Sequence, residues 1–316
     1  MIGRPDPDAL LAGPLGQWLA GQEGARIEAK AKAKQRTIWG IGAACVVGFL
    51  IIAFGGEIST ALEAGFFVGL AGFGWAELAR RPVINRLKSG INNAIAEALD
   101  LKFAAAVTPG EGFSRAKAYG LVPSHDNDSF QDMWSGVLDG RPFVLHEAKL
   151  TEQRGSGKNR RTVTVFEGSI LQIGFARRFN GITLVERQGR HSSWFGSERE
   201  TIRVNDVELA RCDMVDPRFE DTFTVWSNDQ VEGRYLVHPE YIERLLAVET
   251  AFAGEDARAL FLEGDLTIVL ETGNLFESGS LELGNDRALL ARTIDQFATI
   301  AELATRLNER ERAGFN

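Results

Sequence analysis

The chain has 316 residues, a formal net charge of −8 and two cysteines, Cys45 and Cys212. Two cysteines cannot build a disulfide framework, which agrees with a reducing compartment. Residues 106–316 contain 24 basic and 34 acidic side chains, a balance of 24 − 34 = −10, so this part disfavours nucleic acid as a partner. The same part is long enough for one globular domain with its own core.

Two apolar stretches near the N-terminus are the first predicted elements. Residues 37–54 carry no charge, residues 58–76 carry only Glu63, and Gly55-Gly56-Glu57 links them. A bilayer core takes roughly 20 apolar residues per helix, so the pair predicts a transmembrane hairpin over residues 37–76. Small residues that allow close helix packing in lipid recur along both stretches. They are Gly40, Ala44, Gly48, Ala61, Gly65 and Gly69. The alternative is two buried helices of a soluble protein.

Basic residues at both outer ends of the hairpin predict its orientation. Residues 25–36 hold five basic side chains and one acidic one, and Arg80, Arg81, Arg86 and Lys88 follow the second stretch. Lys and Arg next to a span stay on the cytoplasmic side. We therefore expect a multi-pass protein with both termini in the cytoplasm and bilayer lipid as a partner.

The segments after the hairpin switch from helical to alternating patterns. Apolar residues from Ile84 to Leu101 recur at helical spacing and predict a stalk helix, with Pro82 in its first turn. A short helix over residues 113–119 is predicted to end at Gly120. The predicted organisation is an N-terminal cytoplasmic segment 1–36, the hairpin 37–76, a stalk 77–105, a cytoplasmic α+β domain 106–283 and an amphipathic C-terminal helix 284–316.

Turn signals between alternating segments predict four β-hairpins, because type I′ turns favour Asn-Gly and Asp-Gly. The expected pairs are 133–138 with 142–150, 169–178 with 182–186, 200–204 with 207–212, and 258–263 with 266–271. Helices are expected over 239–249 and about 286–312, and the apolar stripe of the last either packs on the sheet or pairs with another copy in a homo-oligomer. The fold class is therefore α+β, with a two-helix transmembrane hairpin followed by a mainly antiparallel-sheet cytoplasmic domain with flanking helices.

Two segments of the domain carry a family resemblance. The first runs from Phe166-Glu167-Gly168 through Phe175 to Phe179-Asn180-Gly181. The second contains Asp216-Pro217-Arg218-Phe219-Glu220 and Asn228-Asp229-Gln230-Val231-Glu232-Gly233-Arg234-Tyr235-Leu236. Together they resemble the bacterial domain of unknown function family 3137 over residues 113–278. The resemblance implies a hydrophobic hairpin ahead of the domain and a place in the bacterial inner membrane, but no activity, cofactor or site residue.

Short strings that resemble catalytic motifs do not complete them. Gly155-Ser156-Gly157-Lys158 lacks the first glycine of a phosphate loop, because Glu152 stands there, and Asn159 replaces the required hydroxyl. A solvated hairpin tip explains this string better. His146-Glu147 lacks the second histidine of a zinc motif, because Leu150 occupies that position. We therefore predict no catalytic, cofactor-binding or metal-binding residues.

Two other groups of side chains are candidate contact sites. Asp229, Gln230, Glu232 and Arg234 form a polar cluster between an apolar strand and a helix start. In one interpretation these side chains satisfy backbone groups and Arg234 pairs with a carboxylate; in the other they form a ligand or partner site. Trp194-Phe195, between Arg190 and Arg199, either contacts a protein or headgroup surface or folds back on the core.

These observations predict a membrane-anchored cytoplasmic domain that acts as a non-catalytic binding, scaffold or sensor module with an unknown protein partner. The alternative is a membrane-tethered enzyme with a carboxylate and arginine site near residues 228–235. A third interpretation is an oligomeric pore centred on Glu63, because a carboxylate at hydrocarbon depth is often functional.

Overall fold

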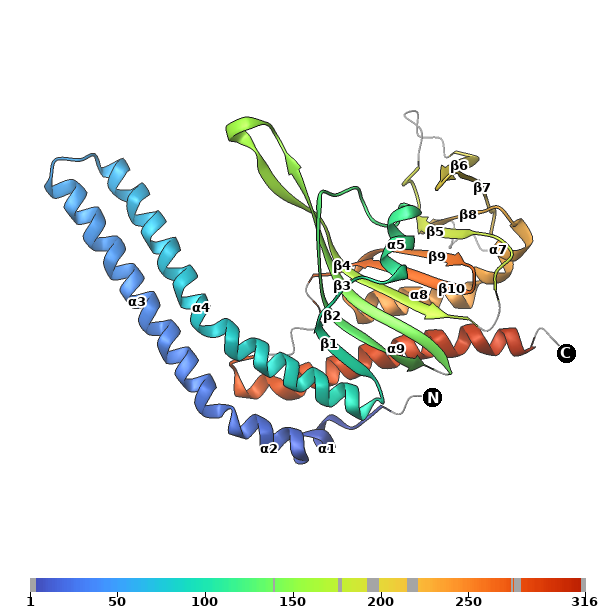
Figure 1. Cartoon of the computed structure of the whole chain (residues 1–316), viewed down its shortest axis with the longest axis horizontal. Helices are drawn as coiled ribbons and strands as arrows, with labels where there is room; N and C mark the ends of the chain where they lie inside the picture. The colour runs from blue at the N-terminus through green and yellow to red at the C-terminus, as the bar shows by residue number, and fades with distance from the viewer. Residues whose placement is uncertain are drawn as a thin grey trace. The chain divides into compact units, whose positions relative to one another are not determined.

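The structure, a computed structural model, describes residues 4–138, 140–175, 178–191, 199–214, 221–273, 275 and 280–313. The chain divides into two compact units, which are described separately. The helical unit comprises Pro5–Ala94 and Glu277–Ala291. The sheet unit comprises Met1–Arg4, Ile95–Phe276 and Arg292–Asn316. Figure 1 labels the elements of both units.

Two long helices dominate the helical unit. Its elements are α1 (Pro7–Ala12), α2 (Pro14–Gly21), α3 (Glu23–Ala53) and most of α4 (Ile58–Ala98). Helices α3 and α4 form an antiparallel pair (Figure 1). A Cβ atom at Gly40 would lie 2.7 Å from the Cα atom of Gly72, so only glycine permits this approach. Gly69, the last of the small residues in the predicted row, has open space around it, and the close approach is made at Gly72 instead.

Helix α4 continues through Pro82, so the prediction that a new helix starts there is wrong. A proline inside a helix removes one hydrogen bond and costs about 3 kcal/mol. Leu87 and Ile91 follow on the same helix and are 0% and 1% exposed. Burying two such side chains contributes about 3–6 kcal/mol, which offsets the proline.

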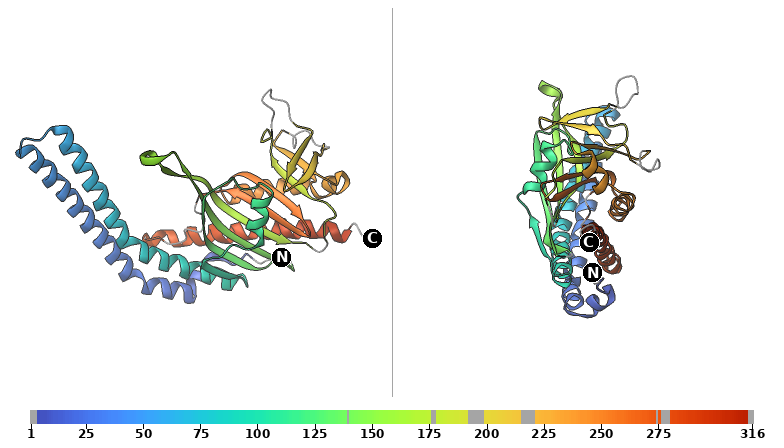
Figure 2. Two further views of the ribbon diagram at one scale, coloured as in Figure 1. Left: turned by 45° about the horizontal axis from the view of Figure 1, so that its top comes forward. Right: turned by 90° about the vertical axis from the view of Figure 1, so that its right-hand side faces the viewer.

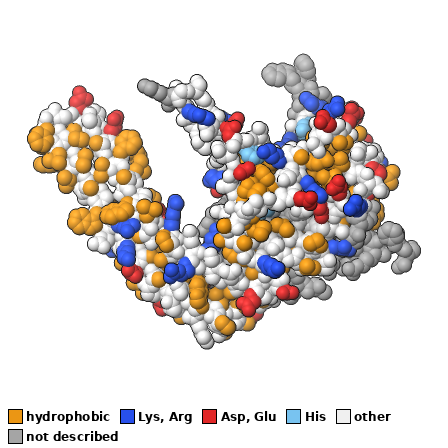
Figure 3. All heavy atoms as spheres, in the orientation of Figure 1, with side chains coloured by type: hydrophobic (Ala, Val, Ile, Leu, Met, Phe, Trp, Pro, Cys, Tyr) orange, Lys and Arg blue, Asp and Glu red, His pale blue; other side chains and the backbone are white. Residues whose placement is uncertain are grey.

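The second half of α3 and the first half of α4 are apolar and exposed. Both helices are long and apolar enough to cross a membrane, and only 6% and 11% of their apolar windows are buried. A core helix of a soluble protein would instead be mostly buried. Figure 3 shows hydrophobic side chains gathered over the ends of both helices.

An ion pair is buried at the other end of the helical unit. Arg26 of α3 is 1% exposed, and its Nη2 atom donates to Oδ1 of Asp286 at 3.0 Å. The second contact joins Nη1 to Oδ2 at 2.9 Å. Asp286 is the first residue of α9 (Asp286–Ala313), so this pair links the two ends of the chain within one unit.

The described residues of the sheet unit form ten strands. They are β1 (Lys102–Ala106), β2 (Asn127–Leu138), β3 (Arg141–Arg154), β4 (Arg161–Gly174), β5 (Thr183–Arg187), β6 (Thr201–Val204), β7 (Val207–Arg211), β8 (Phe223–Ser227), β9 (Glu255–Leu262) and β10 (Asp265–Glu271). Their order is β1-β2-β3-β4-β10-β9-β5-β8-β7-β6, and every paired neighbour is antiparallel. The predicted α+β class with an antiparallel sheet and an N-terminal pair of long apolar helices is confirmed.

Three of the four predicted hairpins are confirmed, namely β2–β3, β6–β7 and β9–β10. At the β6–β7 turn Asn205 and Asp206 have φ angles of 46° and 61°, as a type I′ turn requires. The β9–β10 turn lies one residue earlier than expected, at Glu263-Gly264. The fourth prediction is wrong, because β10 and β9 lie between β4 and β5.

Aromatic packing explains why the chain leaves the sheet after Gly174. Phe175 donates its backbone N–H to the Gly264 carbonyl at 2.7 Å. The rings of Phe175 and Phe179 lie 6.0 and 5.6 Å from that of Phe261 on β9. The connection therefore crosses the β9–β10 turn instead of reversing at residues 180–181.

Helices cover both faces of the sheet (Figure 2). On one face α5 (Glu111–Ala118) packs through Phe113 against Phe130 of β2, with ring centroids 4.7 Å apart. The predicted helix at this position and its Gly120 cap, with φ 73°, are confirmed. On the other face lie α8 (Pro239–Ala251) and α9, both predicted. Phe297 of α9 lies 4.5 Å from Trp134 of β2, so the apolar stripe of α9 packs on the sheet.

Burial of His146 on β3 makes the stability of the sheet unit depend on pH. His146 is 3% exposed, and this burial lowers its pKa from 6.5 to about 4. The unfolded chain therefore binds a proton between these values and the folded chain does not. The contribution of neutral His146 to the free energy of unfolding is complete above pH 6.5. It decreases by about 3 kcal/mol as the pH falls from 6.5 to about 4.

Urea unfolding of the chain and of a His146→Leu variant, at a series of pH values between these limits, tests the effect. We expect the variant to lose the part of the pH dependence that His146 supplies. Parallel pH profiles for the two proteins would contradict the assignment.

Candidate functional site

The predicted polar cluster lies at the start of α7 (Gln230–Leu236), directly after β8. Asp229 is the N-cap of this helix, and its Oδ1 atom accepts from the backbone N–H groups of Val231 and Glu232 at 3.1 and 2.9 Å. An Asp in this position satisfies donors that the helix itself leaves open. The backbone N–H of Asp229 in turn donates to Oγ of Ser227 at 3.1 Å.

Glu232 joins α7 to the chain that leads into β5. It is 6% exposed, and its two carboxylate oxygens accept from the backbone N–H groups of Asn180 at 3.2 Å and Gly181 at 2.7 Å. A Cβ atom at Gly181 would lie 2.7 Å from Oδ1 of Asn228. Glycine is therefore needed at residue 181 for close approach and not for a turn.

Gln230 and Arg234 extend the cluster to the end of β7. The Gln230 side-chain amide donates to the carbonyls of Ala210 at 3.3 Å and Ser227 at 3.2 Å. Arg234 donates through Nε to the Asp213 carbonyl at 3.1 Å. Beside them Cys212 is buried, and desolvation raises the pKa of its thiol, which makes it a poor nucleophile.

All four predicted cluster residues therefore come together. Asp229 caps its own helix, whereas Gln230, Glu232 and Arg234 bond to main-chain groups of other segments. This arrangement suits a clamp that holds the start of α7, the chain before β5 and the chain at the end of β7 together. The alternative, a ligand or partner site, stays a prediction. The other predicted contact site, Trp194-Phe195, lies outside the described residues.

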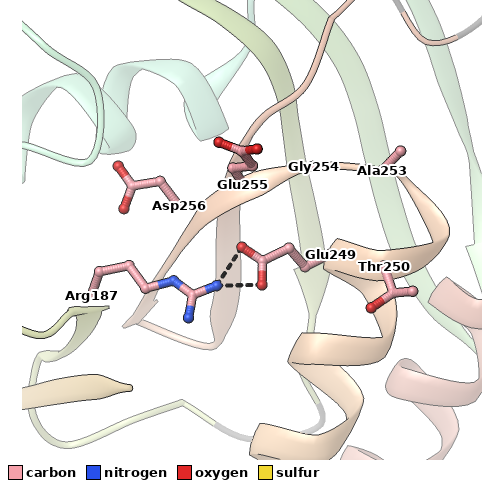
Figure 4. A pocket seen from close by; sticks show the side chains of 7 residues that line it. All are labelled: Arg187, Glu249, Thr250, Ala253, Gly254, Glu255 and Asp256. Atoms are coloured by element: carbon pink, nitrogen blue, oxygen red, sulfur yellow. Dashed lines mark hydrogen bonds and ion pairs between the residues drawn. The ribbon is translucent and has the colours of Figure 1, made fainter. Parts of the chain in front are cut away.

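A second polar site, which the sequence patterns do not indicate, lies at the C-terminal end of α8. A pocket of about 680 Å³ lies between β5, α8 and the start of β9. Figure 4 shows the side chains that line it. Arg187 of β5 donates to the carboxylate of Glu249 on α8. The Arg187 guanidinium also lies 4.6 Å from the centroid of the Phe223 ring. Glu249 in addition accepts from the backbone N–H of Ala257 at 3.2 Å.

Most of the charged groups that line this pocket, namely Arg187, Glu249 and Asp256, form ion pairs, and Glu255 is an exposed carboxylate at its edge. Besides the Arg187–Glu249 pair, Asp256 forms ion pairs with Arg190 and Arg258. The hydroxyl of Thr250 donates to the Leu246 carbonyl at 2.9 Å. The described lining therefore offers a polar hollow without an activated nucleophile.

A comparison with protein families matches residues 164–309 to the model described as "Protein of unknown function (DUF3137)". The match supports this family for residues 164–309. The domain of unknown function family predicted from the sequence is thereby confirmed, over residues 164–309 and not over the predicted 113–278. Both the polar cluster and the Arg187–Glu249 pocket lie inside the DUF3137 segment.

Other comparisons add little to the DUF3137 assignment. No curated protein matches the chain. A solved structure described as the mycobacterial trehalose monomycolate transport factor A is similar with a TM-score of 0.36 and 7% identity. That match covers 68% of this chain and 96% of the other. A likeness at this level carries no argument about this chain. Within the described residues, no group of three or more His, Cys, Asp or Glu is placed to hold a metal ion.

Removing the Glu232 carboxylate tests the clamp in the DUF3137 segment. We expect Glu232→Ala to lower the free energy of unfolding by about 2–4 kcal/mol, because the buried N–H of Gly181 and the partly buried N–H of Asn180 lose their acceptors. Glu232→Gln keeps one acceptor oxygen and should lose less. Denaturant unfolding measures both, with exposed Glu243→Ala as the control. An Ala variant as stable as the control would show that the carboxylate holds nothing in place.

Proposed function

We propose that this chain is a membrane-anchored protein whose sheet unit serves as a non-catalytic binding, scaffold or sensor module at the bacterial inner membrane. In this proposal the α3–α4 pair spans the bilayer, and both termini and the sheet unit lie in the cytoplasm. Its partner is an unidentified protein.

The exposed apolar surface of α3 and α4 carries this proposal. Of the 19 large hydrophobic residues that are exposed in the described chain, 16 lie between Ile38 and Leu78. Soluble monomers rarely expose apolar patches above a few hundred Å². Each such side chain that stays in water lacks about 1.5–3 kcal/mol of the free energy that burial in an apolar environment provides. Contact with lipid would supply it.

Contacts at the membrane ends support the orientation. Arg36 lies one residue before the uncharged stretch and donates to the Trp75 carbonyl at 2.9 Å. Its guanidinium also lies 5.0 Å from the centroid of the Trp75 ring. Trp and Arg favour the headgroup level, and basic flanks favour the cytoplasmic side.

The geometry of the polar groups favours binding over catalysis. Asp229 and Glu232 hold main-chain donors, and Arg187 is paired with Glu249. A catalytic site would instead leave a nucleophile or base within reach of a substrate.

Cysteine labelling in spheroplasts tests the anchoring and its orientation. Native Cys212 is buried and unsuited as a reporter, so the background carries Cys45→Ala alone. An impermeant maleimide is expected to label Glu57→Cys in intact spheroplasts, and Ser156→Cys only after permeabilisation. Labelling of Ser156→Cys in intact spheroplasts would overturn the orientation.

Purified full-length protein tests the binding role. We expect it to retain a specific protein from solubilised membranes. Turnover of a metabolite by the purified chain, lost in a folded Asp229→Asn variant, would overturn the non-catalytic assignment.

A further inference from the structure

Strands β3 and β4 extend beyond the rest of the sheet. Pairing of β2 with β3 ends at Asn127 and Thr151, and pairing of β10 with β4 ends at Glu271 and Gly168. As strand partners, residues 152–163 therefore have only one another in the described chain, from Glu152 with Val163 to Arg154 with Arg161. We name residues 152–163 the ribbon tip. Figure 1 shows it projecting from the sheet.

The ribbon tip is basic, in contrast to the acidic domain that carries it. Residues 153–166 contain four basic residues and no Asp or Glu. The basic residues are Arg154, Lys158, Arg160 and Arg161. The side chains of Arg154, Arg160 and Arg161 are exposed. With Glu152 included, the tip has a net charge of 4 − 1 = +3.

Like charges face each other at the end of the ribbon. Arg154 and Arg161 are cross-strand partners, and such a pair of like charges is unfavourable. Glu152 relieves it only in part, through an exposed contact to Arg154 Nε at 2.9 Å. An anion bound between the arginines would remove the repulsion.

One acidic side chain of the domain reaches the ribbon tip, because Oδ2 of Asp126 accepts from the backbone N–H of Gln153 at 2.7 Å. With Asp126 counted, the tip still has a net charge of 4 − 2 = +2. The end of the ribbon lies farther from the rest of the domain. Arg154 lies three residues beyond Thr151, the last β3 residue paired with β2. At about 3.3 Å per residue this is roughly 10 Å. Charges are screened beyond about 8 Å at physiological ionic strength. The tip therefore presents a local positive potential to its surroundings.

We propose that the ribbon tip binds anionic phospholipid headgroups of the membrane in which the chain is anchored. The inference rests on the proposed membrane anchoring, which tethers the chain that carries the tip to a lipid bilayer. Residues 152–163 contain no aromatic side chain on which a nucleobase could stack, which disfavours RNA. They also lack the large apolar anchors of a protein interface. Diffuse positive charge without such anchors suits an anionic leaflet.

Spin labelling of the full chain in nanodiscs tests this proposal. The label is attached to Ser156→Cys in the Cys45→Ala background. The nanodiscs contain phosphatidylcholine alone or with added phosphatidylglycerol, plus a lipid with a nickel-chelating headgroup that relaxes nearby labels. We expect enhanced relaxation only with phosphatidylglycerol, and its loss at high salt.

Charge variants identify the residues responsible. Each basic residue near an anionic surface changes binding about fivefold, so Arg154→Gln/Arg160→Gln/Arg161→Gln should weaken headgroup contact about 100-fold. The control Lys102→Gln/Lys117→Gln/Arg203→Gln removes the same charge from exposed sites elsewhere in the sheet unit. It should keep the contact.

The remaining outcomes overturn the proposal. Relaxation that is equal in both lipids, or equal in the tip variant and the wild type, excludes an electrostatic headgroup site. A label response to added RNA in phosphatidylcholine nanodiscs, without one to phosphatidylglycerol, would assign the tip to nucleic acid. A chain that does not enter nanodiscs overturns the membrane anchoring itself, whereas an inserted chain with no lipid dependence overturns this inference alone.

Discussion

Replacing Arg26 by methionine is expected to lower the free energy of unfolding of the helical unit by about 3–5 kcal/mol. The guanidinium of Arg26 is 1% exposed and makes two contacts, of 3.0 and 2.9 Å, with the Asp286 carboxylate. Removing one partner of a buried pair leaves the other charge out of water without compensation. Thermal unfolding followed by circular dichroism in detergent should show a midpoint lower by roughly 10 °C or more.

Two further variants make the Arg26 result specific. Arg26→Met/Asp286→Leu removes both charges and should recover much of the loss, because an apolar pair can replace a buried ion pair. Arg287 follows Asp286 on α9 and forms an exposed ion pair with Asp8 of α1. Arg287→Ala breaks this pair and should leave the midpoint unchanged. Equal midpoints for Arg26→Met and Arg287→Ala would mean that the buried pair contributes no stability.

Truncating Phe297 to alanine is expected to destabilise the sheet unit by about 3–5 kcal/mol. Its ring is 0% exposed and lies 4.5 Å from Trp134 and 6.3 Å from Phe143. The substitution leaves a cavity between α9 and the sheet that these neighbours cannot fill. Urea unfolding monitored by tryptophan fluorescence measures the loss.

The control for Phe297 is Arg292→Ala, which shortens an exposed side chain of the same helix. It should change the stability by less than about 0.5 kcal/mol. If the stripe of α9 served only to pair two copies of the chain, the stability of the wild type would rise with protein concentration, and Phe297→Ala would abolish that dependence. If the stripe packs on the sheet, Phe297→Ala lowers the stability at every concentration. A concentration dependence that the variant abolishes would contradict the packing of α9 on the sheet.

Elements with strong local signals were predictable from the sequence. The proline at the start of α8, the glycine after α5 and the positive-φ residues at Asn205-Asp206 each act within a few residues. Their structures follow from local backbone preferences, which the sequence displays directly. The two apolar helices follow equally from composition.

Features that depend on distant partners were not predictable. The dipeptide Asn180-Gly181 is typical of a hairpin turn, yet the β9–β10 hairpin, some 80 residues later, occupies the place beside β4. Strand β2 carries a bulge near Asp132, with φ 54°, that turns Phe130 towards α5 and Trp134 towards α9. A strict two-residue alternation places both rings on one face.

The candidate sites divide in the same way. The polar cluster was visible as a run of polar residues, but the Gly181 N–H group that Glu232 holds lies 51 positions away. Arg187 and Glu249, 62 positions apart, gave no signal at all, because no local pattern links a strand end to a helix end. Only the folded sheet brings them together.

Membrane fractionation tests the central claim, that lipid surrounds residues 37–76. Cells that express the full chain are lysed without detergent, and the membranes are washed in alkaline carbonate and sedimented. The account predicts that the chain stays in the pellet and is released only by detergent. Recovery of the intact chain in the supernatant before detergent is added would contradict it.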